Sequence, residues 1–352
     1  MVRDPLEGCL LGLMVGDSLG LPREGLSPAR ARKLFGDEIR HAFFAGCGMI
    51  SDDTEHACFT AQALLASPRD PEAFSRSLGW KLRLWFLGLP AGIGLATLRS
   101  ILKLWAGFSP ASSGVNSAGN GPVMRTPLIG AFFAADPERL ESFTRASTLM
   151  THRDPRALRA SLAVARAAAY AAAHPGGLFS RETVLAELEK CFPPEDDEAR
   201  RWLSDLGLAL RENWPMERAV RAFGVENGVS GYIYRTVPAA LWAWLRNPAD
   251  FRGGLETILR LGGDADTAGA VCGALLGITA GAEAIPRDWL DGIVEFPRSP
   301  AWTRELAARL ARARNGGASE PLPLAWPWLF VRNPLFLAVV LTHGFRRLFP
   351  PY

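Results

Sequence analysis

Two short acidic segments contain the residue types best suited to metal-assisted chemistry. The first is Ser51-Asp52-Asp53-Thr54 and the second is Gly262-Gly263-Asp264-Ala265-Asp266-Thr267. In each, two carboxylates and a hydroxyl stand where an apolar, helix-like run begins. Crowded carboxylates repel and raise one another's pKa unless a cation compensates them. If the segments meet in the fold, their four aspartates can neutralise two divalent cations, and such oxygen ligands suit Mg²⁺ or Mn²⁺ rather than zinc. The first hypothesis is therefore a two-metal hydrolase.

The same segments also fit an ordinary structural role as helix caps. Ser, Thr and Asp are the usual N-cap residues, and Asp52 followed by Glu55 matches a capping box. Either segment alone is more typical of a cap than of a metal site. Two doublets in matched helical contexts favour metal binding, although spacing alone does not show that they meet.

Composition and charge describe an ordinary globular protein. Of the 352 residues, 48% are hydrophobic and 21% charged, so the chain can bury a large core. A net charge of +3 gives no nucleic-acid footprint, and we expect no stable nucleic-acid complex. Asp4 and Glu7 precede a short apolar run without a basic leader, so we expect no signal peptide and a cytoplasmic protein. Scattered cysteines without a C-x-x-C pair predict free thiols at Cys9, Cys47, Cys58, Cys191 and Cys272.

Helical periodicity dominates the chain and predicts an all-α fold. No run of alternating apolar and polar residues is long enough to predict a strand. Clusters of Pro and Gly at 174–177, 193–194 and 315–317 predict loops. The predicted helices are 55–66, 138–150, 155–173, 181–191, 197–212, 234–246, 252–261, 267–282 and 301–314.

Two segments also repeat glycine every four residues. On a helix this spacing gives a ridge without side chains, along which another backbone can approach closely. Each helical glycine costs about 1 kcal/mol relative to alanine, so we expect a packing reason: both helices lie in the interior, where the ridges are candidates for mutual contact. If they meet, Asp17 and Glu24 lie near the Asp264 end. The ridges are Gly8, Gly12, Gly16 and Gly20, and Gly269, Gly273, Gly277 and Gly281.

The segment 315–352 differs from the rest of the chain. It is rich in Trp and Pro, continues into the apolar stretch 333–341 and ends near the basic pair Arg346-Arg347. The apolar stretch is too short for a bilayer and is interrupted by Pro334, so we expect no transmembrane segment. Packing on a domain formed by residues 1–314 is the expected role, with an interfacial membrane contact or a dimer contact as alternatives. A monomer or weak homo-oligomer is expected.

Several motifs, taken together, resemble the ADP-ribosylglycohydrolase family, which includes dinitrogenase-reductase-activating glycohydrolase. They occur in family order between about residue 5 and residue 314, and the segment after 315 lies outside the resemblance. The motifs are Gly12-Leu13-Met14-Val15-Gly16-Asp17-Ser18-Leu19-Gly20 with Pro22 and Glu24, then Ser51-Asp52-Asp53-Thr54, Asn120-Gly121-Pro122-Val123-Met124-Arg125, Thr151-His152 with Pro155, and Gly262-Gly263-Asp264-Ala265-Asp266-Thr267.

The resemblance implies a single orthogonal helical domain with a dinuclear site for Mg²⁺ or Mn²⁺. Ser51 departs from the threonine usual at its position but keeps a hydroxyl oxygen. Glu24 matches a glutamate on a mobile loop that reaches toward the metals. Arg125 could equally pair with a structural carboxylate, and a lone histidine such as His152 is ordinarily a core residue. The implied metal ligands are Ser51, Asp52, Asp53, Asp264, Asp266 and Thr267. The residues implied to bind ADP-ribose are Asn120, Gly121, Met124, Arg125 and His152.

One departure from the family pattern bears on the substrate. Arginine-specific bacterial relatives carry a segment of the form Pro-x-Asp-Ile-Gly-x-x-Thr, whereas here residues 90–97 have Gly92 in place of the acid. Residues 73–135 contain no Asp or Glu at all. A guanidinium leaving group would find no carboxylate partner there, and a desolvated unpaired charge is costly. We therefore expect the acceptor of ADP-ribose not to be arginine. Serine, another side chain, a nucleic-acid end or a small molecule all stay open.

The expected reaction is metal-dependent hydrolysis of the bond at the anomeric carbon of ADP-ribose. Glu24 is the candidate general acid/base, because its charge is not needed to balance the metals, and Asp264 is the second candidate catalytic carboxylate. Two alternatives remain. One is a two-metal phosphohydrolase, and the other is a non-catalytic ADP-ribose-binding or structural protein with the same fold.

Overall fold

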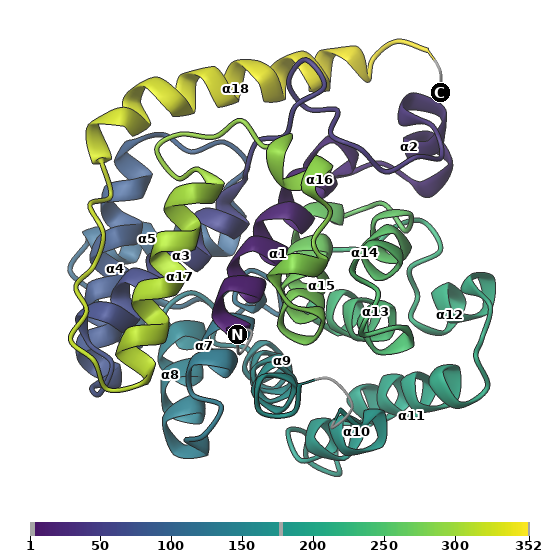
Figure 1. Cartoon of the computed structure of the whole chain (residues 1–352), viewed down its shortest axis with the longest axis horizontal. Helices are drawn as coiled ribbons and strands as arrows, with labels where there is room; N and C mark the ends of the chain where they lie inside the picture. The colour runs from purple at the N-terminus through teal and green to yellow at the C-terminus, as the bar shows by residue number, and fades with distance from the viewer. Residues whose placement is uncertain (1–3, 176–178, 351–352) are drawn as a thin grey trace.

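Two glycine-bearing helices pack against each other at the centre of the protein (Figure 1). They are α1 (Pro5–Gly20) and α15 (Ala265–Ala280). The computed structural model describes residues 4–175 and 179–350. The two helices run antiparallel, because Gly8 meets Gly277 at one end and Gly20 meets Ala265 at the other.

The glycine ridges form the contact between α1 and α15. A Cβ on Gly16 would lie 2.0 Å from the carbonyl oxygen of Gly269, and one on Gly12 would lie 2.1 Å from that of Gly273. Any larger residue would push the backbones apart, so the predicted packing reason for the repeats is present. Gly281 is not part of this ridge. It ends α15 with a φ of 88°, a left-handed conformation that favours glycine.

The other helices surround this central pair (Figure 1). The α-helices are α2 (Pro28–Phe35), α3 (Asp52–Ala66), α4 (Pro71–Leu87), α5 (Leu95–Trp105), α6 (Pro110–Ser113), α7 (Thr126–Phe132), α8 (Pro137–Leu149), α9 (Pro155–Ala173), α10 (Arg181–Glu189), α11 (Asp197–Arg211), α12 (Met216–Ala222), α13 (Ile233–Arg246), α14 (Phe251–Leu259), α16 (Arg287–Asp291), α17 (Pro300–Arg314) and α18 (Leu329–Arg346). Short 3₁₀ turns are η1 (Leu21–Arg23), η2 (Val123–Arg125), η4 (Ala282–Ala284) and η5 (Trp326–Trp328).

The all-α prediction is confirmed. The structure is 67% helical, and its described residues form isolated bridges but no sheet. Each of the nine predicted helices has a counterpart. Helices that lie outside the predicted ranges and the glycine repeats are α2, α4, α5, α6, α7, α12, α16 and α18. The start of α4 nevertheless has a recognisable signal, because Asp70 caps the backbone N–H groups of Glu72 and Ala73 and is followed by Pro71.

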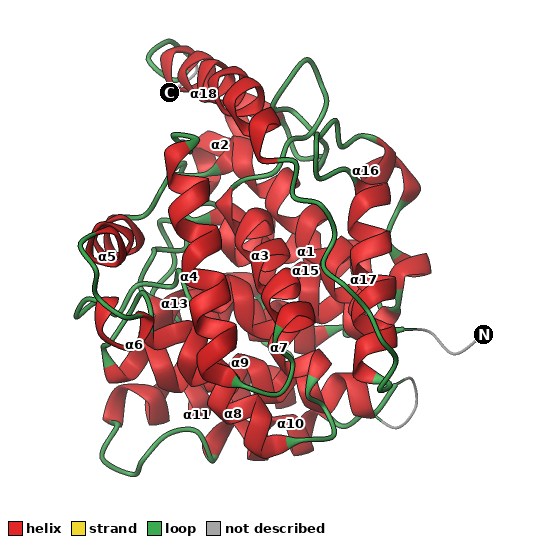
Figure 2. Cartoon of the chain, turned by 90° about the vertical axis from the view of Figure 1, so that its left-hand side faces the viewer, coloured by secondary structure: helices red, strands yellow, loops and turns green. Residues whose placement is uncertain are grey.

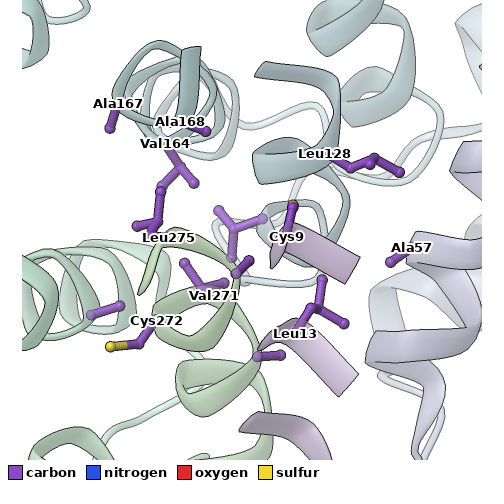
Figure 3. Packing of buried hydrophobic residues seen from close by; sticks show 14 of the residues in the cluster. Cys9, Leu13, Ala57, Leu128, Val164, Ala167, Ala168, Val271, Cys272 and Leu275 are labelled. Carbon is purple, nitrogen blue, oxygen red and sulfur yellow. The ribbon is translucent and has the colours of Figure 1, made fainter. Parts of the chain in front are cut away.

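Small side chains allow the central helices to pack closely. Figure 3 shows Val271 and Leu275 of α15 near Val164 of α9, and Cys9 and Leu13 of α1 on the neighbouring side. Helix α9 contributes a run of buried alanines, including Ala167 and Ala168. The predicted free thiols are confirmed for all five cysteines. This core fixes the relative positions of the N-terminal ends of α3 and α15.

Helix α18 lies along one edge of the molecule, outside the central bundle (Figures 1 and 2). Its buried Arg332 forms an ion pair with the equally buried Glu295, with 2.8 Å between Nη2 and Oε2. Asn333 donates a hydrogen bond of 2.7 Å to the carbonyl oxygen of Gly88. The helical stretch 326–346 is longer than the apolar segment marked by the sequence. By length and composition alone it could cross a membrane: an 18-residue window within it has a mean hydropathy of 1.3, and 28% of that window is buried in the protein.

Candidate functional site

The two acidic segments meet at one end of the central helix pair. The Thr267 hydroxyl, in the first turn of α15, donates a hydrogen bond of 3.1 Å to Oδ2 of Asp53, in the first turn of α3. Both side chains are buried. The sequence alone could not show that the two acidic segments meet, and the structure brings them together at the N-terminal ends of α3 and α15. Their partial positive charge favours anions, including these carboxylates.

Asp17 of α1 holds the Ser51 segment through hydrogen bonds to its carboxylate. Its carboxylate accepts hydrogen bonds from the backbone N–H of Ser51 at 2.9 Å and of Thr54 at 3.1 Å, and from the Thr54 hydroxyl. Ser51, not Asp52, is the N-cap residue of α3, with its Oγ 3.2 Å from the backbone nitrogen of Asp53. Burial raises the pKa of Asp17 to about 6, although its hydrogen bonds oppose this shift.

Asp264 occupies the N-cap position of α15 but does not cap the helix. Its Oδ2 instead accepts a hydrogen bond of 2.6 Å from the side-chain amide of Asn120. Asn120 is oriented by a second hydrogen bond of 3.0 Å to the hydroxyl of Thr236 on α13. The capping interpretation therefore fails for this aspartate, whose side chain is directed at another functional segment.

These carboxylates open into a pocket of about 350 Å³. Its acidic wall contains Glu24, Asp52, Asp264 and Asp266. Thr267 lines the pocket from the same segment as Asp264 and Asp266. The other lining residues come from four further segments and are Gly92, Gly94, Leu95, Ala96, Thr97, Ser117, Gly119, Asn120, Gly121, Met124, His152 and Gly231. A pocket with carboxylates on one wall and glycine-rich loops on another can hold a polar ligand and cations together.

The acidic groups raise one another's pKa. Burial is the main cause of the raised pKa of Asp53 and Asp266, and neighbouring carboxylates, Asp264 among them, add to it. Burial likewise raises the pKa of Asp52, followed by the charges of Asp17 and Glu24. Within the cluster alone, these groups therefore keep their protons to a higher pH than an ordinary aspartate does. A nearby cation would reverse the effect by stabilising the ionised forms.

The donor set fits hard divalent cations. Asp53 Oδ1 and Asp266 Oδ1 are buried and have no hydrogen-bond partner, which is costly for a carboxylate and is relieved by a metal ion. Among the described residues, no three Asp, Glu, His or Cys side chains by themselves form a ready metal cage. Hydroxyl oxygens such as those of Ser51 and Thr267, together with water or a ligand, would have to complete the coordination.

Glu24 reaches the pocket from a short segment after η1. Gly25 donates a backbone hydrogen bond of 2.7 Å to the carbonyl oxygen of Gly263, and Gly263 donates one of 2.7 Å to Leu26. Gly263 has a φ of 73°, and a Cβ there would lie 2.0 Å from the carbonyl oxygen of Val229. The loop that the resemblance describes as mobile is thus pinned to the Gly262-Gly263 turn. Lost hydration, followed by the charge of Asp264, raises the pKa of Glu24, and Arg347 opposes the shift.

The Asn120 loop and His152 form another part of the pocket wall. A Cβ on Gly119 or Gly121 would lie 3.1 Å from the His152 ring, so glycine permits close packing of loop and ring. His152 is 2% exposed, and burial followed by the charge of Arg125 lowers its pKa to about 3. The imidazole is therefore neutral, with Nδ1 2.9 Å from the hydroxyl of Thr151. Met124 is buried and lines the pocket.

Arg125 lies behind the pocket and does not line it. Its fully buried guanidinium donates to the hydroxyl and the carbonyl oxygen of Ser147, each at 3.0 Å, and to the hydroxyl of Thr151 at 2.9 Å. The group therefore lies too deep for direct contact with a ligand, and it is held by hydroxyl and carbonyl oxygens rather than by the carboxylate considered in the sequence. Its place beneath Thr151 and His152 favours a positioning role.

Gly92, which stands in place of the acid of the arginine-specific relatives, lies in the pocket wall. Gly92 has a φ of 82°, and a Cβ on it would meet no heavy atom within 4 Å. Leu95 and Thr97 of the same segment also line the pocket. Ser117 and Gly231 line the pocket and Thr236 binds Asn120, and the sequence singled out none of the three. They lie outside any motif, and Thr236 contributes only because α13 passes behind Asn120.

Comparisons with known proteins agree with the fold. The model of the ADP-ribosylglycohydrolase family matches residues 2–319. A protein of Archaeoglobus fulgidus is 31% identical over 88% of this chain and 96% of its own length. The ADP-ribosyl-[dinitrogen reductase] glycohydrolase of Rhodospirillum rubrum is 27% identical over 82% of this chain and 90% of its own length. A solved structure described as an ADP-ribosylglycohydrolase-related protein complex has a TM-score of 0.64 and 30% identity, and it covers 88% of this chain and 98% of that one.

These features define an all-α protein with a carboxylate-lined pocket. The chain belongs to the ADP-ribosylglycohydrolase family. The match ends at residue 319, so most of the segment that contains α18 lies beyond it.

Proposed function

We propose that this protein is a divalent-cation-dependent hydrolase that releases ADP-ribose from a modified acceptor other than arginine. One observation carries the proposal. A single pocket is lined by Glu24, Asp52, Asp264 and Asp266 together with the Asn120 loop and His152. The family supplies the class of reaction, and the pocket supplies groups that can perform it.

The metal-binding part of the proposal rests on the unpaired buried oxygens of Asp53 and Asp266. Asp52, Asp53, Asp264 and Asp266, with the hydroxyls of Ser51 and Thr267, would hold two Mg²⁺ or Mn²⁺ ions. When bound, such ions orient the vicinal hydroxyls of a ribose and lower the pKa of a water molecule. Asn120 limits where Asp264 can move, because its amide is fixed between Asp264 and Thr236.

Glu24 is the carboxylate best placed for proton transfer. It lines the pocket, and its pKa is raised above the ordinary value by lost hydration and by Asp264 and Asp17. A carboxyl with a raised pKa is better able to donate a proton as well as to accept one at working pH. Cleavage at the anomeric carbon builds positive charge on the ribose, which the surrounding carboxylates stabilise.

His152 contributes as a neutral hydrogen-bonding group. Arg125 already donates to the hydroxyl oxygen of Thr151, so the hydroxyl proton is available for Nδ1 of His152 at 2.9 Å. In that arrangement Nε2 carries the ring proton and can donate it to an oxygen of the ligand. The glycines at 119 and 121 leave backbone groups accessible for phosphate oxygens.

The pocket wall that contains Gly92 supports the choice of a non-arginine acceptor. An arginine leaving group carries a guanidinium, and this wall offers Gly92, Gly94, Leu95, Ala96 and Thr97 but no carboxylate. An unpaired guanidinium in a partly desolvated pocket is unfavourable. A neutral ether or ester oxygen as leaving group requires no such partner, so an O-linked acceptor such as a serine side chain fits better.

The acceptor is tested with matched substrates and matched variants. Purified protein with Mg²⁺ is assayed for ADP-ribose release from arginine-, serine- and nucleic-acid-linked substrates. Gly92→Asp restores an acid at the wall, and Gly92→Asn reproduces its shape and backbone strain without the charge. We expect release from a non-arginine substrate by the parent protein, and a gain on the arginine substrate in Gly92→Asp alone. Efficient arginine release by the parent protein contradicts the proposed acceptor.

A further inference from the structure

The C-terminal helix α18 is apolar on both of its faces. Its inner face packs on the protein through Leu329, Phe336 and Val339, which are buried, and through the buried pair Arg332 and Asn333. Its outer face is exposed to solvent and carries large apolar side chains. With their exposed fractions, these are Phe330 63%, Val331 55%, Leu335 40%, Leu337 41%, Leu341 62% and Phe345 64%.

A surface helix of a globular protein ordinarily presents charged residues to water. Between Trp328 and Phe345 the only ionisable residues of α18 are Arg332 and His343. Arg332 is buried in its ion pair, and His343 is directed at the carbonyl oxygen of Phe43 and stacks on its ring at 4.9 Å. No charged side chain therefore remains on the outer face. A continuous exposed apolar stripe of this kind marks an interaction surface.

The exposed surface continues beside the start of α18. Asn333 donates to the carbonyl oxygen of Gly88, and the flanking residues Leu87 and Leu89 are 50% and 76% exposed. The chain segments that form this surface contain no acidic residues. Residues 321–352 contain no Asp or Glu, and residues 73–135 contain none either. Exposed Arg346 lies at the end of the helix.

Aromatic and aliphatic side chains on one face, with basic residues and no acids in the same segment 321–352, match the surface of an anionic bilayer. We propose that the outer face of α18, from Trp328 to Phe345, binds an anionic membrane surface with the helix lying in the plane of the interface. The exposed apolar side chains enter the boundary between head groups and acyl chains, and basic residues contact the lipid phosphates.

The inner-face contacts favour this orientation over a membrane-spanning helix. A spanning α18 would have to leave the protein, which separates Arg332 from Glu295 and places an unpaired guanidinium in hydrocarbon. In the interfacial orientation the Arg332–Glu295 pair and the Asn333–Gly88 hydrogen bond stay intact. Only side chains that are already exposed change their environment.

The test is sedimentation of the full-length protein with vesicles of phosphatidylcholine, with and without phosphatidylglycerol. Leu341→Glu/Phe345→Glu places two charges on the outer face. Arg201→Gln/Arg211→Gln is the control, because it lowers the net charge by the same amount on α11, which lies at the opposite end of the molecule from α18 (Figure 1). We expect the parent protein and the control to bind anionic vesicles, and binding to fall at least about tenfold in the Glu variant and with added salt.

Three outcomes would overturn the proposal. They are absence of binding to anionic vesicles by the parent protein, equal binding by the Glu variant, and resistance of bound protein to alkaline carbonate extraction, which indicates a spanning helix. Sedimentation velocity without lipid tests whether a second copy of the chain binds this face instead. A dimer that the Glu variant abolishes, in a protein that does not bind vesicles, would assign the face to a second copy of the chain. ADP-ribose release by the same samples shows that the variants are folded.

Discussion

The Thr267 hydroxyl donates a hydrogen bond of 3.1 Å to Oδ2 of Asp53, and it joins the first turns of α15 and α3 across 214 residues of sequence. The contact exists because α1 and α15 pack through their glycine ridges, while Asp17 of α1 holds the backbone of the Ser51 segment. Assembly of the site thus depends on the close backbone contact between α1 and α15.

The first prediction concerns the glycine ridge. Gly16→Ala places a Cβ 2.0 Å from the carbonyl oxygen of Gly269, where backbone rather than a flexible side chain must move. We expect a loss of about 3 kcal/mol or more in the free energy of unfolding, measured with urea. Gly344→Ala in α18 is the control, because a Cβ there meets nothing within 4 Å and helix propensity alone should stabilise it, by up to about 1 kcal/mol. Equal effects of the two substitutions would contradict the ridge contact.

The second prediction concerns divalent cations. The crowded carboxylates destabilise the metal-free protein, so Mg²⁺ or Mn²⁺ should raise its melting temperature, with about 2.7 kcal/mol gained at one hundred times the dissociation constant. Asp53→Asn should reduce this gain, and it should itself stabilise the protein in chelator by removing repulsion. Asp291→Asn, the same change at an exposed site on α16, should leave the response unchanged. A melting temperature indifferent to both metals would refute the metal site.

The third prediction concerns the link between Asn120 and Asp264. Asn120→Asp replaces the donor 2.6 Å from Asp264 by a second carboxylate, whereas Asn120→Ala only removes the donor. In chelator we expect the melting temperature to fall in the order parent, Asn120→Ala, Asn120→Asp. Added Mn²⁺ should recover more stability in the aspartate variant, because the cation offsets the repulsion. The reverse order of recovery would argue against cation binding next to Asp264.

The fourth prediction concerns pH. Burial, followed by the charge of Arg125, lowers the pKa of His152 to about 3, whereas an unfolded histidine titrates near 6.5. Between these values the unfolded chain binds a proton that the folded protein does not. The contribution of His152 to stability is therefore complete above about pH 6.5 and is lost as the pH falls. Lowering the pH from 7.5 to 5.0 should cost the parent protein about 2 kcal/mol more than His152→Asn, measured by urea unfolding. An equal pH dependence in both proteins would mean that His152 is protonated normally.

The fifth prediction concerns the anchor of α18. Arg332 and Glu295 are both buried, and both hold the backbone of Ile50, next to the Ser51 segment. Arg332→Met should cost about 3–5 kcal/mol, because it leaves Glu295 unpaired. Adding Glu295→Gln should restore part of this loss. A single substitution with no effect on the free energy of unfolding would show that α18 is not anchored here.

The sequence predicted the elements whose signals are local. The glycine repeats indicated close packing because no other residue fits so near a backbone, and the paired aspartates indicated a shared site. Helix α18 was missed because its apolar character on both faces lacks the one-sided period of an ordinary surface helix. Helices α4 and α5 were missed although Asp70-Pro71 marks the start of one of them.

The direction in which a side chain points depends on how the whole fold packs. The sequence alone therefore could not show which motif residues line the pocket. Arg125 and His152 both belong to family-like motifs, yet only His152 lines the pocket, because Arg125 is directed toward Ser147 and Thr151. Thr236 and Gly231 reach the site through the path of the chain around α13 and carry no motif of their own.

Chromatographic identification of the product released from a panel of ADP-ribosylated substrates is the decisive measurement of what the pocket does. The assay is run with Mg²⁺, with chelator and with Asp264→Asn. We predict intact ADP-ribose, released only with metal and lost in the variant. AMP or phosphate would assign the pocket to a phosphohydrolase, and metal binding without turnover of any substrate would assign it to a non-catalytic ADP-ribose-binding protein; either result would contradict the proposed hydrolase.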